Sequence, residues 1–197
     1  MGGFLKILII FAILILALVG IFVFANFFKN QNQRPITKNL DLPQKINMKL
    51  TSPAFENNQL IPLKYTCKGQ DVNPPLKIEE VPPHAKSLVL VVDDPDAPRD
   101  VWSHWIVVNI NPSVSFIEEN SVPKGGVEGL NDFKKRSYGG PCPPSGIHHY
   151  HFKVYALDTI LDTNFCLEKK EVEKAMRGHI LDWAELVGIF GVFKNRN

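Results

Sequence analysis

Short runs of apolar, strand-forming residues, separated by clusters of Pro, Gly and Asn, recur through most of this chain. Such clusters limit each strand to a few residues and make the chain reverse direction often. Helical periodicity is convincing only in residues 168–176, where Val172 and Met176 share one face. The pattern predicts a mainly β domain with many turns and little helix, with strands at residues 46–50, 60–65, 88–92, 102–110, 150–157 and 180–190.

The first part of the chain has a different character. No charged residue occurs from Ile7 to Phe28, and Ile, Leu, Phe, Val and Ala dominate. A helix of this length reaches about 30 Å, the thickness of the hydrocarbon core of a bilayer. Because the apolar region of a signal peptide is usually shorter, about 7–15 residues, the run predicts a retained transmembrane helix over residues 4–28 more than a cleaved signal. The expected localisation is therefore a single-pass membrane protein, with its orientation left open.

A polar segment follows this run. Residues 29–45 are rich in Asn and Gln and contain two prolines, which is typical of a linker, so the β-rich domain is expected over residues 46–197. The formal charge of the whole chain is +2, and no acidic residue occurs in residues 1–40, which hold the basic residues Lys6, Lys29, Arg34 and Lys38. The domain itself is therefore slightly acidic and has no stripe of Lys and Arg, so nucleic acid is not expected as a partner.

The cysteines do not define a disulfide framework. Cys67, Cys142 and Cys166 are too few and too scattered for such a framework or for a zinc ribbon. One pair could form a disulfide if the domain faces an oxidising compartment. The sequence alone gives no connectivity.

A predicted buried strand ends in an acidic turn. Residues 88–92 are apolar without alternation, which is typical of a strand covered on both faces. The strand stops at Pro95, because proline cannot donate to the ladder. Asp94 and Asp96 flank this proline, so a rigid turn would direct both carboxylates toward one place. An ordinary surface turn is the alternative, since Asp and Pro are common turn formers.

Two histidines are predicted to face the core near strand ends. Alternate side chains of a strand point the same way, so His104 is expected to share a face with Ile106 and Val108. By the same rule His148 shares a face with Tyr150. Each histidine alone is more often a hydrogen-bonded core residue than a functional one. Together with a Tyr hydroxyl and the acidic turn, however, they indicate one small shared pocket.

Metal and hydrolase chemistry are alternative interpretations of these residues. A metal site would use the ligands His104, His148 and Asp94 or Asp96, but the sequence has no HExxH motif and no Cys pair at metal spacing, so no metal is expected. A hydrolase would need an activated nucleophile, and no GxSxG motif is present. Glycine-rich segments do not join a strand to a helix as a nucleotide loop would. No catalytic residue and no cofactor are therefore predicted.

Six segments of the chain form a recognisable combination. They are IPLKYTCKGQDVNPPL, KSLVLVVDDPDAP, WSHWIVVNI, GLNDF, YGGPCPPSGIHHYHFKVYALD and AMRGHILDWAELVGIFG. In this order they resemble the phosphatidylethanolamine-binding protein family, in its bacterial and archaeal branch described as Raf-kinase-inhibitor-like. The resemblance covers nearly all of residues 46–193 and leaves out residues 1–45. The DPDAP segment and the GPCPP segment that leads into HxY are specific in combination.

The resemblance implies a fold and a site. The fold would be an antiparallel β-sheet sandwich with few short helices, with a small anion-accepting cavity at one end. Carried over motif by motif, the cavity would be lined by Asp94, Asp96, His104, Pro144, His148 and Tyr150. The family commonly has Arg between this His and Tyr, where this chain has His149. By strand alternation His149 faces away from the cavity, so this difference should not alter the site.

The function expected from the residues and the resemblance is that of a membrane-anchored binding protein. Its cavity would accept a phosphate-bearing headgroup or a similar small anion. His104, His148 and Tyr150 would donate hydrogen bonds to phosphate oxygens, while the two carboxylates hold the imidazoles or meet an ammonium group. One alternative is a protein-interaction module that inhibits a kinase or protease through the cavity rim, as relatives are described, and a less favoured one is a hydrolase. The natural ligand, the partner and the oligomeric state stay open.

Overall fold

The β-rich domain contains two sheets and little helix. The computed structural model describes residues 42, 46–164 and 167–192. The elements in this part of the chain are β1 (Lys49–Thr51), β2 (Gln59–Leu60), the 3-10 helix η1 (Leu63–Tyr65), β3 (Leu76–Glu79), β4 (Ser87–Asp94), β5 (Trp102–Ile110), β6 (Phe116–Ile117), β7 (Val127–Glu128), β8 (Gly146–Leu157), α2 (Lys169–Met176) and β9 (Ile180–Val192). The large sheet has the order β2-β9-β8-β4-β5-β7 and the small sheet the order β1-β3-β6. Only the pair β2 and β9 is parallel among these strands.

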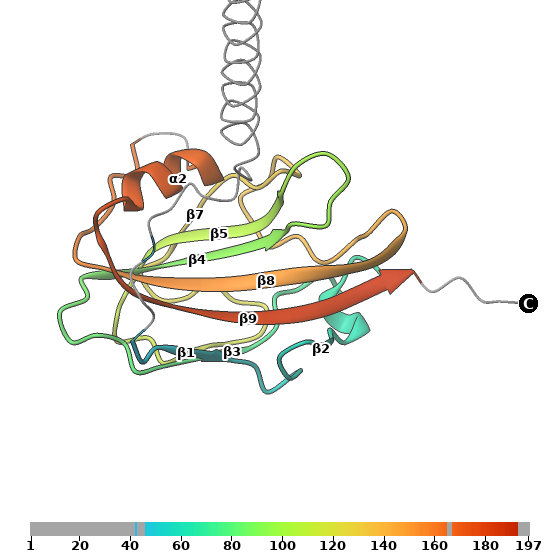
Figure 1. The fold of residues 1–197 in the computed structure, drawn as a ribbon, viewed down its shortest axis with the longest axis horizontal. Helices are drawn as coiled ribbons and strands as arrows, with labels where there is room; N and C mark the ends of the chain where they lie inside the picture. The colour runs from blue at the N-terminus through green and yellow to red at the C-terminus, as the bar shows by residue number, and fades with distance from the viewer. Residues whose placement is uncertain (1–41, 43–45, 165–166, 193–197) are drawn as a thin grey trace, which may run out of the picture. The chain divides into compact units, whose positions relative to one another are not determined.

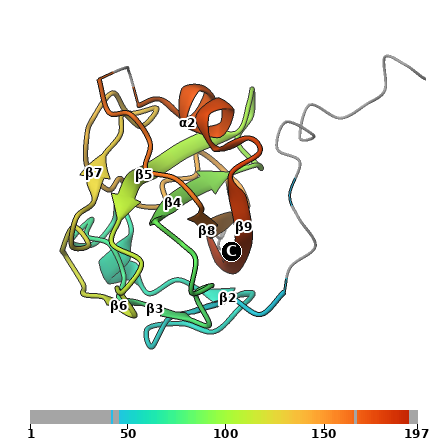
Figure 2. The same cartoon turned by 90° about the vertical axis from the view of Figure 1, so that its left-hand side faces the viewer.

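The large sheet lies between the small sheet on one face and α2 on the other, as Figures 1 and 2 show. Each face of the large sheet therefore has its own core. The core between the two sheets includes Leu90, Trp105, Tyr150, Phe152 and Leu186. The core under α2 includes Val91, Ile106, Val172 and Met176. Every residue of β4 is buried, because this central strand is covered on both faces.

The long strand β8 shows the alternation that divides these two faces. From His148 to Val154 its residues alternate between buried and more exposed. The buried set, which begins with His148 and Tyr150, faces the small sheet, and the other set begins with His149. The predicted inward direction of His148 and Tyr150, and the outward direction of His149, agree with this pattern.

Most of the β pattern was visible in the sequence, and the mainly β sandwich is confirmed. The helical segment 168–176 is α2. Residues 60–65 form no continuous strand, however, since the short strand β2 gives way to η1 at Pro62, whose ring removes a ladder donor. The short strands β3, β6 and β7 were not predicted, because segments of two to four residues carry too little alternation to stand out.

The predicted transmembrane helix is corrected. Within residues 42, 46–164 and 167–192, no helix has the length and apolar character needed to cross a bilayer. The α-helix of this part of the chain, α2, has 8 residues and several charged ones. The fold class with a membrane-spanning helix, and the single-pass membrane localisation, are therefore wrong on this finding. Residues 4–28, where the helix was expected, and the proposed linker, apart from Leu42, lie outside the described residues.

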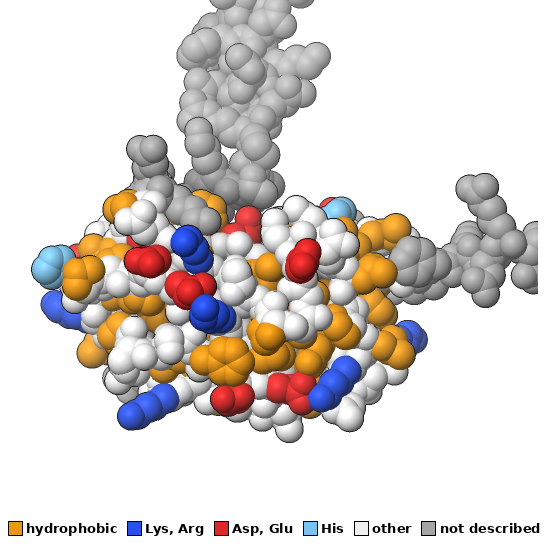
Figure 3. Space-filling model, turned by 90° about the horizontal axis from the view of Figure 1, so that it is seen from below, with side chains coloured by type: hydrophobic (Ala, Val, Ile, Leu, Met, Phe, Trp, Pro, Cys, Tyr) orange, Lys and Arg blue, Asp and Glu red, His pale blue; other side chains and the backbone are white. Residues whose placement is uncertain are grey.

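The face of the small sheet carries charges of both signs. In Figure 3, which views the molecule from this side, basic and acidic side chains are interspersed among apolar ones. One such pair joins Lys77 to Glu79 over 2.8 Å. The part of this face formed by described residues therefore offers no extended basic surface to a polyanion.

Candidate ligand-binding site

Strand β4 ends in two buried aspartates, whose side chains lie on opposite faces of the large sheet. Asp93 forms ion pairs with two lysines on the α2 side. Asp94 is only 4% exposed and belongs to the other face. One of its oxygens accepts a hydrogen bond from Nδ1 of His148 over 2.7 Å, and the other accepts from the main-chain N–H of Asp96 over 2.8 Å. Both oxygens of this buried carboxylate are thus satisfied, as burial of a charge requires.

A β-bulge in β5 brings His104 to the same face as His148. Trp105 pairs with Val92, and Ser103 pairs with Asp93. One step along β4 is therefore matched by two steps along β5, and His104 is the extra residue. An extra residue of this kind shifts the alternation of the strand by one position, so that His104 and Trp105 both lie on the side of the small sheet.

The bulge corrects one expectation from strand alternation. His104 does not share a face with Ile106 and Val108, because those two side chains lie in the core under α2. Its imidazole instead packs edge-on against the ring of Tyr150, with ring centroids 5.2 Å apart. His104 thus reaches the predicted face, although the rule used to place it there does not hold across a bulge.

The main chain at Gly139 holds the ring of His104. Nδ1 of His104 lies 2.7 Å from the carbonyl oxygen of Gly139, and the N–H of Gly139 donates to the carbonyl of His104 over 3.0 Å. The histidine is 3% exposed. Burial lowers the pKa of His104 and outweighs the opposite effects of the Gly139 carbonyl and of Asp94. The ring is therefore a neutral imidazole at neutral pH, with its proton on Nδ1.

Tyr150 lies between the two histidines with its hydroxyl unused. Its ring packs edge-on against His104 and stacks on His148, whose centroid lies 6.4 Å away. The side chain is 0% exposed, and among described residues its hydroxyl has no hydrogen-bond partner of normal geometry. Burial raises the pKa of the Tyr150 phenol, and the negative charge of Asp94 raises it further. The main chain of Cys142 lowers this pKa, but by less. The group is thus a neutral O–H donor without an acceptor, which costs free energy unless a ligand supplies one.

Two of the predicted site residues lie at the surface. The side chain of Asp96 is 42% exposed and pairs with the ring of His149 over 2.7 Å. Burial acts to raise the pKa of Asp96, but the hydrogen bonds from His149 outweigh it and lower the pKa. Pro144 is exposed, whereas its neighbour Pro143 is buried. The structure therefore groups Asp94, His104, His148 and Tyr150, and leaves Asp96 and Pro144 outside that group.

A disulfide fastens the loop before β8. Cys67 and Cys142 are bonded, with Cα atoms 5.5 Å apart, and the N–H of Cys67 donates to the carbonyl of Pro141 over 3.2 Å. The sequence left this pairing open, and the third cysteine lies outside the described residues. The same loop supplies the Gly139 carbonyl that holds His104. Sequence reasoning missed this carbonyl, because a main-chain acceptor has no side-chain signature.

An exposed aromatic pair lies next to His104. Trp102 and Phe133 are 39% and 38% exposed and contact each other edge to face at 5.4 Å. The ring of Phe133 also lies 5.3 Å from that of His104. This pair was not among the predicted site residues, and it forms an apolar border beside the histidine.

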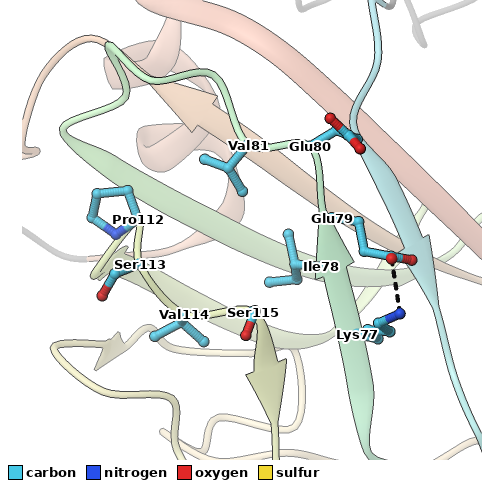
Figure 4. Close-up of a pocket in the computed structure, with 9 residues that line it drawn as sticks. All are labelled: Lys77, Ile78, Glu79, Glu80, Val81, Pro112, Ser113, Val114 and Ser115. Carbon is cyan, nitrogen blue, oxygen red and sulfur yellow. Dashed lines mark hydrogen bonds and ion pairs between the residues drawn. The ribbon is translucent and has the colours of Figure 1, made fainter.

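Two surface depressions lie away from this group of residues. One, of about 390 Å³, lies between β3 and residues 112–115 and is lined by charged, hydroxyl and apolar side chains (Figure 4). A second, of about 480 Å³, lies near Trp105, Glu128 and Tyr138. Neither includes any of the predicted site residues. The site around Tyr150 is thus identified by its polar groups.

Metal ligation was one interpretation of the same histidines. Within the described ranges, no group of three His, Cys, Asp or Glu side chains is arranged to hold a metal ion. His104 and His148 both use Nδ1 for hydrogen bonds within the protein.

Comparison with known proteins agrees with this architecture. A sequence model of the family described as phosphatidylethanolamine-binding protein matches residues 51–191. The chain belongs to this family. The match begins in β1 and ends in β9, so it includes every element that forms the site.

Relatives of this chain within the phosphatidylethanolamine-binding protein (PEBP) family occur in archaea and bacteria. A UPF0098 protein of Pyrococcus horikoshii is 51% identical over 157 residues, which cover 75% of this chain and 78% of the relative. A UPF0098 protein of Chlamydia trachomatis is 45% identical over 148 residues, which cover 73% and 98%. The similarity to these relatives thus covers about three quarters of this chain.

Two solved structures share the PEBP fold. One, from Chlamydia trachomatis and described as a PEBP homologue, has a TM-score of 0.71 at 44% identity and covers 74% of this chain and 98% of its own. The other, E. coli YbcL, described as a new member of the mammalian PEBP family, has a TM-score of 0.71 at 30% identity, with coverage of 75% and 100%. The chain thus has the fold of a PEBP-type binding protein.

Proposed function

We propose that this PEBP-family chain binds a small phosphate-bearing ligand, or a similar small anion, at Tyr150, His104 and His148. The observation that carries the proposal is the buried hydroxyl of Tyr150, which has no acceptor in the described part of the protein. Leaving such a group unpaired costs about 1–3 kcal/mol, so its retention between two histidines favours an external acceptor. A phosphate oxygen is an acceptor of the right kind.

The surroundings support binding of an anion with modest affinity. Asp94 holds the ring of His148 through Nδ1, and the Gly139 carbonyl holds that of His104, so both rings keep Nε2 for a ligand. Among described residues, no Lys or Arg forms an ion pair with Asp94 or Asp96. Asp96 and Pro144 would form the outer edge of the site, where the carboxylate of Asp96 can meet the ammonium group of a headgroup. Without a Lys or Arg paired to these carboxylates in the described part of the chain, the attraction for the anion rests on the histidines and on Tyr150.

The proposal is one of binding rather than of turnover. Cys142 is the cysteine nearest in sequence to β8, the strand that carries His148 and Tyr150. Its disulfide with Cys67 removes the thiolate that a nucleophile requires. The described contacts of His104 and His148 are with a carbonyl, a carboxylate and aromatic rings, and none is with a serine hydroxyl. A histidine that activates a nucleophile would contact one.

Calorimetric titration of the full-length chain with phosphoethanolamine and with inorganic phosphate tests the proposal. Tyr150→Phe should weaken binding about fivefold to thirtyfold, because it removes one hydrogen bond donor and little else. Tyr155→Phe is the matched control, since Tyr155 lies in the core under α2 and should leave the affinity unchanged. Equal affinities of the Tyr150→Phe variant and the unmodified chain would reject the assignment.

A second candidate function rests on the aromatic pair beside the site. Trp102 and Phe133 expose apolar surface, and such residues are enriched where proteins contact one another. A kinase or protease could be bound there. Inhibition of a candidate enzyme that is lost in Trp102→Ala but kept in Tyr150→Phe would favour this function, and the opposite pattern would reject it.

A further inference from the structure

The two histidines of the site are held through the same ring nitrogen but by different acceptors. Nδ1 of His104 lies 2.7 Å from the Gly139 carbonyl, and Nδ1 of His148 lies 2.7 Å from the Asp94 carboxylate. A carbonyl or ionised carboxylate oxygen has no proton to give, so both Nδ1 atoms carry one. In a neutral imidazole Nε2 is then a lone pair, which accepts hydrogen bonds and cannot donate them.

This arrangement does not suit a ligand that only accepts hydrogen bonds. Tyr150 can donate its hydroxyl to one ligand oxygen, but the neutral ring of His104 presents an acceptor to another. A ligand that brings its own proton can satisfy this acceptor.

The two rings differ in how well they tolerate an added proton. A proton on Nε2 of His148 gives an imidazolium whose charge is balanced by Asp94 in direct contact. A proton on His104 would face the neutral main chain of Gly139 and Gly140 and the rings of Tyr150 and Phe133. The charge of Asp94 also favours a proton there, but burial outweighs this effect. His104 is also 3% exposed, so a charge there would be largely removed from water.

The other titratable groups near the two rings do not reverse this difference. Asp93 is neutralised by two lysines on the α2 side, and Asp96 pairs with His149 at the surface. Asp132, on the loop beside β5, accepts hydrogen bonds from Ser103. Residues 139–145 before β8 and residues 188–191 of the adjacent strand β9 contain no charged residue.

We propose that the site selects phosphate monoesters over phosphodiesters, with His148 donating to an ionised phosphate oxygen and His104 accepting a hydrogen bond from the P–OH group of the ligand. The proposal rests on the proposed function and specifies its ligand class. A monoester carries a dissociable proton, which is lost near pH 6, and so it can supply this P–OH group. A diester has no such proton, and its oxygens would face the lone pair of His104.

The same geometry couples binding to protons. In the complex the monoester is a monoanion, whereas above about pH 6 the free ligand is mostly a dianion. Binding therefore takes up about one proton at pH 7.5 and fewer at pH 5.5. The affinity for a monoester should accordingly fall as the pH rises from 5.5 to 7.5.

Titration of the full-length chain with phosphoethanolamine and with glycerophosphoethanolamine tests the proposal. The two probes share the amine and differ in being a monoester and a diester. At pH 6.0 the monoester should bind about tenfold more tightly or better, because the diester leaves one buried acceptor unpaired. Repeating the titration in buffers of different ionisation enthalpy counts the protons taken up. Equal or tighter binding of the diester would overturn the inference while leaving the proposed function intact, and no binding of either probe would overturn both.

A variant of the accepting histidine gives a second test. His104→Asn places N–H donors at this position, so the preference for the monoester should shrink at least threefold. The matched control is His151→Asn. His151 lies on the face of β8 opposite to His148, where it pairs with Glu185 of β9, so its replacement should leave the preference unchanged. If the His104 variant does not fold, 15N NMR of the unmodified chain decides. A proton on Nδ1 of His104 at pH 7 is expected, and a proton on Nε2 would overturn the inference.

Discussion

His148 and Asp94 form a buried pair between β8 and the end of the adjacent strand β4. Nδ1 and Oδ2 are 2.7 Å apart, and the two side chains are 8% and 5% exposed. The carboxylate fixes the orientation of the imidazole, as acidic partners of functional histidines do in other proteins. Because the pair is shielded from solvent, its hydrogen bond is stronger than the one between Asp96 and His149 at the surface.

Replacing the two aspartates should therefore have unequal effects. Asp94→Asn removes the charge that holds His148 and should weaken binding of phosphoethanolamine about 10- to 100-fold. Asp96→Asn alters an exposed pair and should weaken it less than about threefold. Calorimetric titration of both variants measures the difference. Similar losses in the two variants would mean that the buried pair has no special role.

The hydroxyl of Tyr150 should lower the stability of the free protein. Because this buried group has no acceptor among described residues, Tyr150→Phe should raise the free energy of unfolding of the unliganded chain by about 1–2 kcal/mol. The same variant should bind phosphoethanolamine more weakly, so the two effects have opposite signs. Urea denaturation without and with ligand measures both. A destabilised variant without ligand would show that the hydroxyl has a partner in the free protein.

Asp182 should make stability depend on acidic pH. It is 1% exposed, and its carboxylate accepts hydrogen bonds from the main-chain N–H groups of Ile46, Asn47, Met48 and Trp183. Burial acts to raise the pKa of Asp182, but these donors outweigh it and lower the pKa. The stabilisation is therefore fully present above the pKa of the unfolded chain, about 3.9, and is lost as the pH falls through the lower folded pKa.

Comparison of Asp182→Asn with the unmodified chain tests this dependence. The variant should be less stable by about 1–3 kcal/mol at pH 6, and the difference should shrink as the pH approaches 2. Glu79→Gln is the control, because Glu79 forms only an exposed pair with Lys77 and should change stability little. Chemical denaturation between pH 2 and 6 provides the measurement. A difference that does not vary with pH would contradict the assigned role of the carboxylate.

The disulfide should stabilise both the domain and the site. Cys67 and Cys142 are 75 positions apart, so their bond restricts the unfolded chain strongly, and the double Ser variant should lose about 2–5 kcal/mol. Because the same loop carries the Gly139 carbonyl, binding should weaken as well. Thermal denaturation with and without a reductant provides the measurement. The double variant should not respond to the reductant, and a reductant effect of equal size in both proteins would contradict the role of this bond.

Side-chain patterns allowed much of the fold and part of the site to be predicted. The apolar run of β4 and the alternation of β8 reflect burial directly, so the strands, and the inward direction of His148 and Tyr150, could be read from the sequence. The bulge at His104 could not, because no residue type marks it and it shifts the alternation of the strand. The partner of His104 is a main-chain carbonyl, and Asp96 turned out to pair with His149, so neither contact follows from residue type.

The apolar run over residues 7–28 was a strong composition signal, and it led to a transmembrane prediction. The described residues contain no helix that meets the length and apolarity required for such a span. The proposed ligand site depends on none of that segment, since every residue that forms it lies between β4 and β9.

A crystal structure of the full-length chain with phosphoethanolamine would locate the ligand. We expect a phosphate group within about 2.5–3.2 Å of the Tyr150 hydroxyl and of Nε2 of both His104 and His148. We also expect the bonds from Nδ1 to Gly139 and Asp94 to persist. A phosphate bound instead in the depression between β3 and residues 112–115, with the Tyr150 hydroxyl still unpaired, would rule out the proposed site.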